Sequence, residues 1–463
     1  MEARARIELA NSGFADRCIT PLLSGHIKNY MKWNIKKANF FSSDKKVSFI
    51  IRIKLIILLT CLIYIISNYY TVFNRIIVNI FYLHLIIKSY FLFIGMFFVK
   101  TKKTEKVSIT NYPIYTILIP MFKENEVIVT QIIKAITNIN YPKSKLDVKI
   151  LLEESDKHTQ NLFQNKTLPD YFKIMPVPYS IPQTKPKALN YGIQESKGKY
   201  CVVYDAEDIP DPNQLVDALS TFIKEDADII QYPLKIKTND KSTLESCFRL
   251  EYAIWFKYML TGISRSKCIN TLGGTSNHFK IEILKHKGWD VYNVTEDLAL
   301  GLDLSLKKKK FLFKKTHPTV EEAPKTLKSW IMQRRRWYKG YLYTYLDKFL
   351  KVGVYRPAEF FSFHFFIGGL FISILITPFV FIDILINFKN SETFLITSII
   401  FTLIYNYAIL KNLKKCKLNF KIKSIIGMNF YILLHFVATV LALYDLVKSP
   451  FYWHKTEHFG INA

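Results

Sequence analysis

Apolar residues concentrate in two blocks of the chain, residues 49–99 and 360–447, which flank a more polar middle. A helix that crosses a bilayer needs about 20 predominantly apolar residues, and both blocks contain runs of that length. This distribution predicts membrane-spanning flanks around a soluble centre. The 463 residues also suffice for two or three structural units.

Five apolar runs are expected to enter the membrane: Leu55–Phe73, Ile76–Val99, Phe360–Ile386, Phe394–Leu410 and Ile425–Val447. Only Asn74-Arg75 separates the first two, so a tight hairpin is expected there. Lys88 falls in the middle of the second run, where a charge is costly, so it should face protein or water, or the helix is tilted. The last run contains His435 and Asp445 and is expected either to span or to lie in the interface.

Basic residues flank these runs and give the chain a net charge of +27. The clusters Lys100–Lys103 and Lys411–Lys423 favour cytoplasmic anchors that face anionic membrane lipids. The positive-inside rule therefore predicts an integral protein of the plasma (inner) membrane, with the middle of the chain in the cytoplasm. Nucleic-acid binding is the other interpretation of the charge, and we expect no nucleic-acid partner.

The middle of the chain alternates short apolar strands with polar helices. Strands are expected at Tyr115–Ile119, Val148–Leu152, Phe172–Val177, Tyr200–Tyr204 and Ile229–Tyr232, and helices near Glu126–Thr137, Pro186–Glu195 and Asn213–Lys224. This alternation predicts right-handed crossovers and an α/β fold with a mostly parallel sheet. Ligands of such sheets bind at the carboxyl ends of the strands, where the polar motifs described next fall.

Three carboxylates follow directly on the expected strand Tyr200–Tyr204: Asp205, Glu207 and Asp208. Alternate acidic side chains at a strand end can bind one hard divalent cation, Mg²⁺ or Mn²⁺, through oxygen ligands. A polar turn that caps the helix near Asn213 explains the same residues, and the cluster alone favours neither interpretation.

A second acidic motif, Thr295-Glu296-Asp297, stands near the start of a helical stretch. Thr295 in the N-cap position, with two acids that favour the helix dipole, is the simpler interpretation. The functional one is a general base, because a carboxylate near a metal can take the proton of an attacking hydroxyl.

A third motif places Gln333, Arg336 and Trp337 at i, i+3 and i+4, on one face of a helix. Arg336 is suited to a diphosphate and Trp337 to stacking on a sugar. The opposite face carries Arg334 and Arg335, which is typical of a basic amphipathic helix on a membrane surface. The two interpretations are compatible.

Two weaker signals complete the set. Lys185 stands at an expected helix start, where a lysine suits phosphate or nucleotide, although a surface lysine is the simpler interpretation. The stretch Leu272–His278 contains two glycines and small polar residues, so a ligand can approach its backbone closely, or it is a plain turn.

The order and spacing of these motifs resemble the family-2 glycosyltransferases, in particular the membrane-embedded branch that includes cellulose synthase-like proteins. The resemblance runs from about Tyr115 to Trp337, and more loosely through the closing membrane helices to Pro450–Thr456. In this family Asp205–Asp208 resembles the metal-binding DxD motif, Thr295–Asp297 matches the TED motif and Gln333–Trp337 matches QxxRW.

The resemblance implies a GT-A fold and an inverting transfer from a nucleotide-sugar donor to a hydroxyl on a lipid or saccharide acceptor, with a β-linked product. It implies Asp297 as the catalytic base and Mg²⁺ or Mn²⁺ held by Asp205 with Glu207 or Asp208. Where the family has an aspartate after its second strand, Glu153 aligns best and Asp156 is the substitute. The expected donor contacts are Glu153, Asp156, Lys185, Asp205, Gln333, Arg336 and Trp337, and the acceptor contacts are Gly273, Gly274, Thr275 and Glu296.

The resulting domain boundaries are an N-terminal cytoplasmic segment 1–48, a transmembrane hairpin 49–100, a cytoplasmic GT-A catalytic domain 101–328, an amphipathic interface helix 329–355 and a C-terminal membrane region 356–463. A transporter or channel is an alternative, against which the long soluble middle argues. A non-catalytic scaffold is another, against which the intact Asp297 and Gln333–Trp337 argue. Five spans are few for a polymer conduit unless the chain oligomerises, and the sequence leaves processive and single transfer open.

Overall fold

The computed structural model describes residues 44–98, 110–164, 166–238, 242–266, 268–349, 351–352, 356–386, 400, 403–404, 407 and 422–449. The chain divides into two compact units, residues 1–61 and 62–463. Every contact discussed below lies within the second unit. The N-terminal segment 1–43 and most of the expected span Phe394–Leu410 lie outside the described residues.

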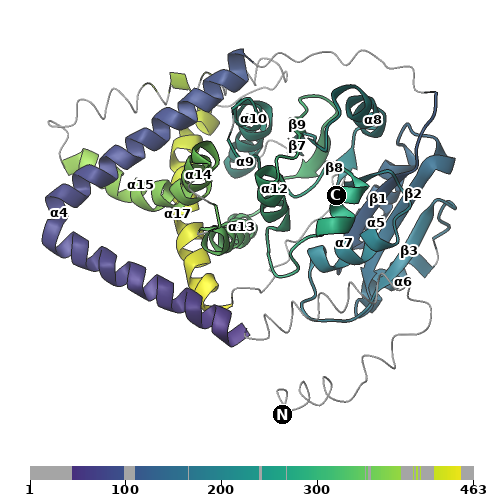
Figure 1. The fold of residues 1–463 in the computed structure, drawn as a ribbon, viewed down its shortest axis with the longest axis horizontal. Coiled ribbons are helices and arrows are strands. Elements are labelled where there is room, and N and C mark those ends of the chain that lie inside the picture. The colour runs from purple at the N-terminus through teal and green to yellow at the C-terminus, as the bar shows by residue number, and fades with distance from the viewer. Residues whose placement is uncertain are drawn as a thin grey trace, which may run out of the picture. The chain divides into compact units, whose positions relative to one another are not determined.

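A seven-stranded sheet forms the centre of the α/β part, in the order β3-β2-β1-β4-β8-β6-β9 (Figure 1). Its strands are β1 (Tyr115–Met121), β2 (Leu146–Glu153), β3 (Phe172–Val177), β4 (Tyr200–Val203), β6 (Ile229–Gln231), β8 (Asn277–Lys280) and β9 (Phe311–Phe313). Strand β8 runs antiparallel to both neighbours and the other pairs are parallel. The predicted α/β fold with a mostly parallel sheet is therefore confirmed.

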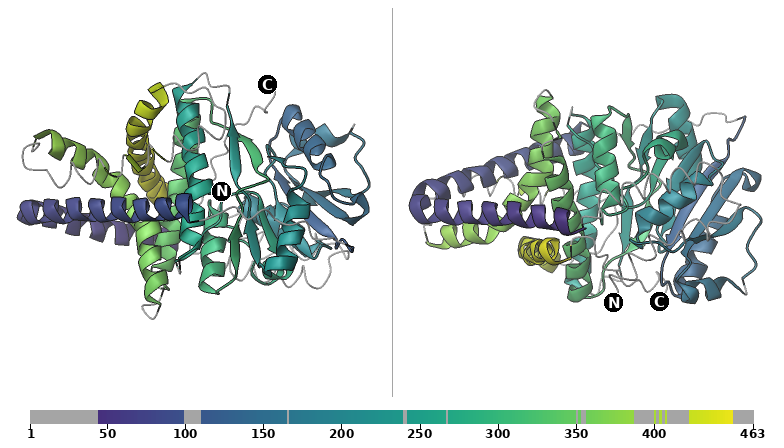
Figure 2. Two further views of the ribbon diagram at one scale, coloured as in Figure 1. Left: turned by 90° about the horizontal axis from the view of Figure 1, so that it is seen from above. Right: turned by 60° about the horizontal axis from the view of Figure 1, so that its bottom comes forward.

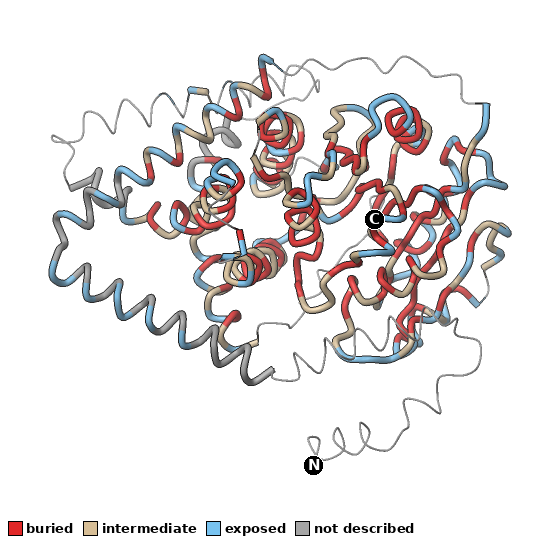
Figure 3. The backbone as a smooth tube through the Cα atoms, viewed as in Figure 1, coloured by how far each residue is buried: buried red, intermediate tan, exposed pale blue. Residues whose placement is uncertain are grey.

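Helices cover both faces of this sheet. Helices α5 (Glu126–Thr137), α6 (Lys157–Gln164) and α8 (Gln214–Glu225) pack with one core, and α7 (Lys185–Gln194), α11 (Ile281–Lys287) and α12 (Glu296–Leu306) with the other. Successive side chains of β1 alternate between the two, since Ile117 and Ile119 belong to the first core and Leu118 to the second. Most residues of the central strands are buried and are drawn in red in Figure 3.

Parallel pairing aligns the strand ends. Leu118 pairs with Val203 of β4, and Met121 pairs with Leu152 of β2. The residues that follow β1, β2 and β4 therefore meet at one edge of the sheet, as expected for a ligand site.

A second sheet of three strands adjoins this edge, in the order β5-β10-β7. Its strands are β5 (Ile209–Pro210), β7 (Leu234–Lys237) and β10 (Thr319–Glu322). Because β5 starts directly after Asp208 and pairs with β10, the small sheet brings β10 beside the acidic motif.

The remaining helices form a second packed region. They are α4 (Asp44–Phe97), α9 (Thr243–Ile254), η2 (Trp255–Met259), α10 (Leu260–Ser264), α13 (Leu327–Lys348), α14 (Pro357–Phe363), η3 (His364–Gly368), α15 (Gly369–Ile386) and α17 (Ile422–Lys448), and the short η1 (Lys143–Lys145) precedes β2. Helix α17, yellow in Figure 2, packs against α9, α13 and α15. Their shared core includes Phe248, Trp330, Phe371 and Tyr431.

Three stretches of the described residues are long and apolar enough to cross a membrane: Asn79–Phe97, Pro357–Phe379 and Phe430–Lys448. They overlap the second, third and fifth predicted runs. The expected connector Asn74-Arg75 is itself helical, and the first two predicted runs belong to the single element α4. Asn74-Arg75 is therefore not a loop connector, because apolar residues on both sides of the pair continue the helical pattern. The hairpin of the two runs stays a prediction.

Candidate active site

Residues from every predicted motif line one cavity of about 920 Å³. Its polar end contains five of the predicted charged side chains, namely Lys185, Asp205, Glu207, Glu296 and Asp297. The motifs are distant in the sequence, and the strand ends, α7, α12 and α13 bring them together.

Asp297 lies in the first turn of α12, whose N-cap position is occupied by Thr295. The Thr295 hydroxyl donates to Asn293 Oδ1 at 3.2 Å and accepts from no N–H of the helix. Thr295 therefore occupies the predicted N-cap position, but its side chain does not cap the helix. Burial, and next the neighbouring Glu296 carboxylate, raise the pKa of Asp297 to about 7, while Lys185 and backbone N–H groups oppose the rise. A carboxylate with such a pKa is suited to general-base chemistry near neutral pH.

Lys185 is the first residue of α7 and sits among acidic side chains. Its Nζ lies 2.5 Å from Asp205 Oδ1 and 3.5 Å from Glu296 Oε1, and it donates to the Gly274 carbonyl at 2.8 Å. Burial lowers its pKa, but Asp205 and Glu296 outweigh that effect, so the net pKa is raised and the ammonium stays charged. The site thus holds a fixed cation between the two acidic motifs.

The three carboxylates of the acidic turn, Asp205, Glu207 and Asp208, do not all face the cavity. Asp208 is fully buried, and its Oδ2 accepts from the Asp205 backbone N–H at 2.7 Å and from the Thr275 hydroxyl. Asp205 and Glu207 instead line the cavity. Asp208 and Thr275 therefore shape the turn from behind, while Asp205 and Glu207 face the ligand space.

Glu321 on β10 is a site residue that the motifs did not indicate. It lines the cavity, and burial followed by the charges of Glu207 and Asp205 raises its pKa well above the usual range. Its place depends on the pairing of β10 with β5 and β7, which are distant in sequence. The sequence offers only an acidic pair in a short segment, which is no signal of a site.

The residues present fit a divalent cation. Asp205, Glu207 and Glu321 offer only oxygen donors, and the mutual repulsion of their negative charges is relieved by a bound cation. The buried Asp208 Oδ1 has no hydrogen-bond partner. Among the described residues no three His, Cys, Asp or Glu side chains are placed to hold a metal by themselves. Mg²⁺ commonly takes one or two carboxylates and completes its shell with substrate phosphates and water, so Asp205 and Glu207 suffice.

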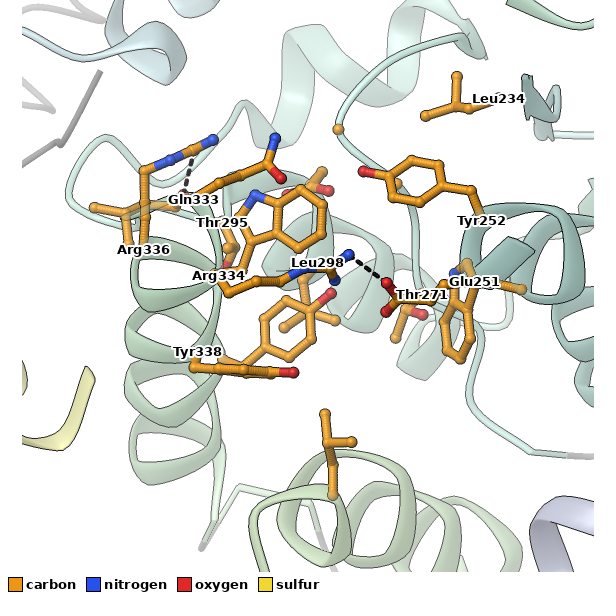
Figure 4. Close-up of a pocket in the computed structure, with 18 of the residues that line it drawn as sticks. Leu234, Glu251, Tyr252, Thr271, Thr295, Leu298, Gln333, Arg334, Arg336 and Tyr338 are labelled. Atoms are coloured by element: carbon orange, nitrogen blue, oxygen red, sulfur yellow. Dashed lines mark hydrogen bonds and ion pairs between the residues drawn. The ribbon is translucent and has the colours of Figure 1, made fainter. Parts of the chain in front are cut away.

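Helix α13 carries the Gln333–Trp337 motif over the same cavity (Figure 4). Arg336 Nη1 donates to the Val294 carbonyl at 3.4 Å, just before α12. Burial lowers its pKa, and the Glu296, Asp205, Asp297 and Glu207 carboxylates oppose that shift. Gln333 is buried, and its Oε1 has no hydrogen-bond partner. A cation and an open amide oxygen therefore face the polar end.

The membrane-surface interpretation placed Arg334 and Arg335 on the opposite face of this helix. In the structure Arg334 lines the cavity, and both arginines pair with acidic side chains of other helices. Arg334 Nη2 lies 2.5 Å from Glu251 Oε2 (Figure 4). The Arg334 guanidinium lies over the Trp337 ring, 4.4 Å from its centre. Arg335 forms an ion pair with Asp445 of α17. The acidic partners lie on α9 and α17, so local helical spacing could not reveal them.

The two alternatives for the nucleotide carboxylate are placed differently. Glu153, at the end of β2, lines the cavity and pairs with Lys187 Nζ at 2.7 Å. Asp156 is 4% exposed; its Oδ1 accepts from Thr159 N at 3.2 Å and its Oδ2 from Lys123 N at 2.5 Å. Asp156 thus organises the loop and the start of α6, and Glu153 is the better placed for a ligand.

Only part of the predicted acceptor loop lines the cavity. Gly273 and Gly274 line the cavity, and a Cβ added to Gly274 would stand 3.9 Å from Asp297 Oδ2. Thr275 is buried behind them. His278 belongs to β8 and contacts the Tyr115 hydroxyl at 2.7 Å in the core, so the loop ends earlier than expected.

Comparison with known proteins identifies the family of the central domain. Residues 113–340 match the model of "Glycosyltransferase like family 2". A probable glycosyltransferase of Bacillus subtilis, YdaM, is 27% identical over 75% of this chain and 87% of its own length. A beta-monoglucosyldiacylglycerol synthase of Nostoc is 25% identical over 55% of this chain, and glucomannan 4-beta-mannosyltransferase 2 of Arabidopsis thaliana is 24% identical over 51%. The matched segments are 54% and 46% of those two proteins, so the chain spans about half of their length.

A solved structure supports the fold. The mannosyltransferase PcManGT of Pyrobaculum calidifontis, determined in complex with GDP-Man and Mn²⁺, superposes with a TM-score of 0.53 at 16% identity over 79% of this chain and 98% of that chain. At this identity the likeness is one of fold. Residues 113–340 therefore form a glycosyltransferase domain of family 2 with the GT-A fold.

Proposed function

We propose that this protein is a membrane-bound inverting glycosyltransferase that moves a sugar from a nucleotide donor to a hydroxyl of a lipid or saccharide acceptor. The observation that carries the proposal is the meeting of Asp205, Lys185, Asp297 and Arg336 in one cavity. The three apolar stretches support attachment to a membrane, and the basic segments support a cytoplasmic active site.

In this proposal the donor diphosphate lies beside Lys185 and Arg336. Their fixed positive charges stabilise the negative charge that develops on the diphosphate as the bond to the sugar breaks. A divalent cation held by Asp205 and Glu207 supplies further positive charge there when it is bound. Glu153 and Gln333 offer oxygen acceptors to the nucleotide and the sugar.

Asp297 takes the proton from the acceptor hydroxyl as that oxygen attacks the sugar carbon. The Gly273–Gly274 loop adjoins Asp297 and leaves room for the acceptor, since neither residue has a side chain. Attack from the side opposite the diphosphate inverts the anomeric carbon, so an α-linked donor gives a β-linked product.

The test is the Asp297→Asn variant of the full chain. With a panel of sugar nucleotides, we expect transfer to fall on the order of 10²–10⁴-fold, because a general base contributes that much. Nucleotide binding, measured by calorimetry, should stay close to wild type. Asp303→Asn is the matched control on the same helix, since Asp303 pairs with Lys287 and Lys348 and does not line the cavity. Substantial turnover by Asp297→Asn would remove Asp297 as the base.

A further inference from the structure

The cavity does not end at the carboxylates but continues between the membrane helices. Its deep walls come from α4, α15 and α17 and are mostly apolar, with Phe81, Leu85, Leu92, Leu370, Ile374 and Ile432 among them. The polar side chains in these walls include His84, Lys88, Ser373, Thr377 and His435. Each of these three helices includes residues of a stretch that is apolar enough to cross a membrane. A single space thus joins the polar site to the apolar interior of the helix group.

One face of α4 follows this space for much of its length. The lining positions 81, 84, 85, 88 and 92 recur at helical spacing, so they share one face. Eleven residues separate Phe81 from Leu92, which corresponds to about 16 Å of helix. Ile86, on the opposite face, is 54% exposed. The cavity therefore follows most of the apolar stretch Asn79–Phe97.

Two nitrogen-bearing side chains of α4, His84 and Lys88, lie one turn apart in this wall. His84 is 2% exposed, and neither ring nitrogen has a hydrogen-bond partner. Lys88 makes neither a hydrogen bond nor an ion pair with any described residue. Glu251, a carboxylate of the same cavity, is already engaged by Arg334 at 2.5 Å and by the Tyr431 hydroxyl at 2.9 Å. The Glu251 charge acts on Lys88 from the same cavity, but it forms no ion pair with it. A cation without a contacting anion in an apolar wall is costly and points to a ligand that supplies the anion.

Tyr341 of α13 links this region to the base. After burial, the charges of Asp297 and Glu251 both raise the pKa of its hydroxyl, so Tyr341 lies within the field of both carboxylates. Because Tyr341 also lines the cavity, the space near Glu251 and Lys88 leads directly to Asp297.

We propose that the deep part of the cavity binds an anionic amphiphile that supplies the acceptor hydroxyl. Its acyl chains lie between α4, α15 and α17, its phosphodiester pairs with Lys88 and accepts from His84, and its free head-group hydroxyl reaches Asp297. The inference rests on the proposed function and names its acceptor class. The bond from the sugar carbon to the diphosphate breaks, a bond from that carbon to the lipid oxygen forms, the proton passes to Asp297, and the nucleoside diphosphate leaves.

The walls favour a lipid over a growing saccharide. Aliphatic and aromatic carbon suits acyl chains, whose burial is favourable. A saccharide would bring many hydroxyl groups, and each would lose hydrogen bonds to water against such walls.

The experiment uses the full chain in phosphatidylcholine nanodiscs that contain either phosphatidylglycerol, which is anionic and has free hydroxyls, or diacylglycerol, which is neutral and has one. Nucleoside diphosphate release reports donor use, and mass spectrometry reports the glycosylated product. We expect glycosylated phosphatidylglycerol from the wild type. Lys88→Met should lower kcat/KM for phosphatidylglycerol about tenfold or more, because a charged hydrogen bond is lost, and leave that for diacylglycerol within about twofold. Lys88→Arg should retain the preference.

A second pair of variants tests the chain-binding walls. Leu85→Trp fills the cavity and should raise KM for the lipid, whereas Ile86→Trp, on the outer face of the same turn, should not. Equal effects of Lys88→Met on both lipids, or of the two Trp variants on KM, would overturn the inference. So would a water-soluble polymer as the product, which leaves the proposed function intact. No nucleoside diphosphate release from any donor would overturn the proposed function and the inference with it.

Discussion

Asp297 lies between two charged neighbours of opposite sign. The Glu296 carboxylate raises its pKa and the Lys185 ammonium lowers it, on top of the larger effect of burial. The resulting value of about 7 means that the carboxyl is largely protonated below neutral pH and is available as a base above it.

The pH profile should report these neighbours individually. For the wild type, kcat/KM for the acceptor should rise with pH and level off above about 7, since only the ionised Asp297 accepts a proton. Lys185→Met removes a group that lowers the pKa of Asp297, so the rising limb should move to higher pH. Glu296→Gln removes one that raises it, so the limb should move to lower pH. Shifts of the same sign in the two variants would contradict the assignment, whatever their effect on the maximal rate.

The sequence indicated those site residues whose neighbours are local. Asp205 follows a strand, and Asp297 lies in the first turn of a helix. Both motifs could therefore be recognised from the sequence alone. Glu321 and Glu251 could not be found in this way, because each reaches the cavity through partners from distant segments. Asp208 and Thr275 show the opposite case. Their local pattern suggested that they contact the ligand, but in the structure they are buried and bond to each other.

At the scale of elements, α13 packs tightly on the start of α12. Gly340 faces Thr295, and a Cβ added to Gly340 would lie 2.8 Å from Thr295 Cγ2. Thr295 is buried, so it has little room to move. The position of Asp297 therefore depends on the absence of a side chain on the neighbouring helix.

Gly340→Ala tests this contact. The substitution favours an isolated helix by about 1 kcal/mol, but the overlap should cost about 1–3 kcal/mol. A displacement of about 1 Å at Asp297 should lower transfer on the order of 10²-fold. Lys328→Ala, at an exposed position of the same helix, is the control for activity and for thermal unfolding. Unchanged transfer by Gly340→Ala would show that the α12–α13 contact does not position the base.

At the scale of the whole described molecule, the sequence predicted the strands and helices that alternate along the chain better than it predicted β8 and the small second sheet. Strands β1 to β4 and β6 were expected because apolar runs alternate with helices. The antiparallel β8 and the small sheet β5-β10-β7 were not, since short strands of two to four residues depend on distant partners. The helical junction in α4 was missed because two polar residues suggested a turn.

Contacts between distant segments also join α13 of the glycosyltransferase domain to α17, one of the helices that are apolar enough to cross a membrane. Arg335 of α13 forms its ion pair with Asp445 of α17, whose side chain is 3% exposed, and Lys339 donates to the Ser449 carbonyl at 3.1 Å. Trp330 Nε1 donates to the Tyr431 hydroxyl at 2.6 Å. Because α13 also carries Gln333–Trp337, its attachment to α17 should hold the donor site in place.

Asp445→Asn separates this attachment from the chemistry, since neither Arg335 nor Asp445 lines the cavity. Loss of a buried charged pair should lower the free energy of unfolding by about 1.5–3 kcal/mol, and the loosened α13 should raise KM for the donor. Asp347→Asn is the matched control, because Asp347 pairs with Lys351 at the exposed i,i+4 position and should contribute less than about 1 kcal/mol. Thermal unfolding of both variants with and without nucleotide, together with donor kinetics, distinguishes them. If both variants behave alike, α17 supports α13 only through apolar packing, and the donor site does not depend on the ion pair.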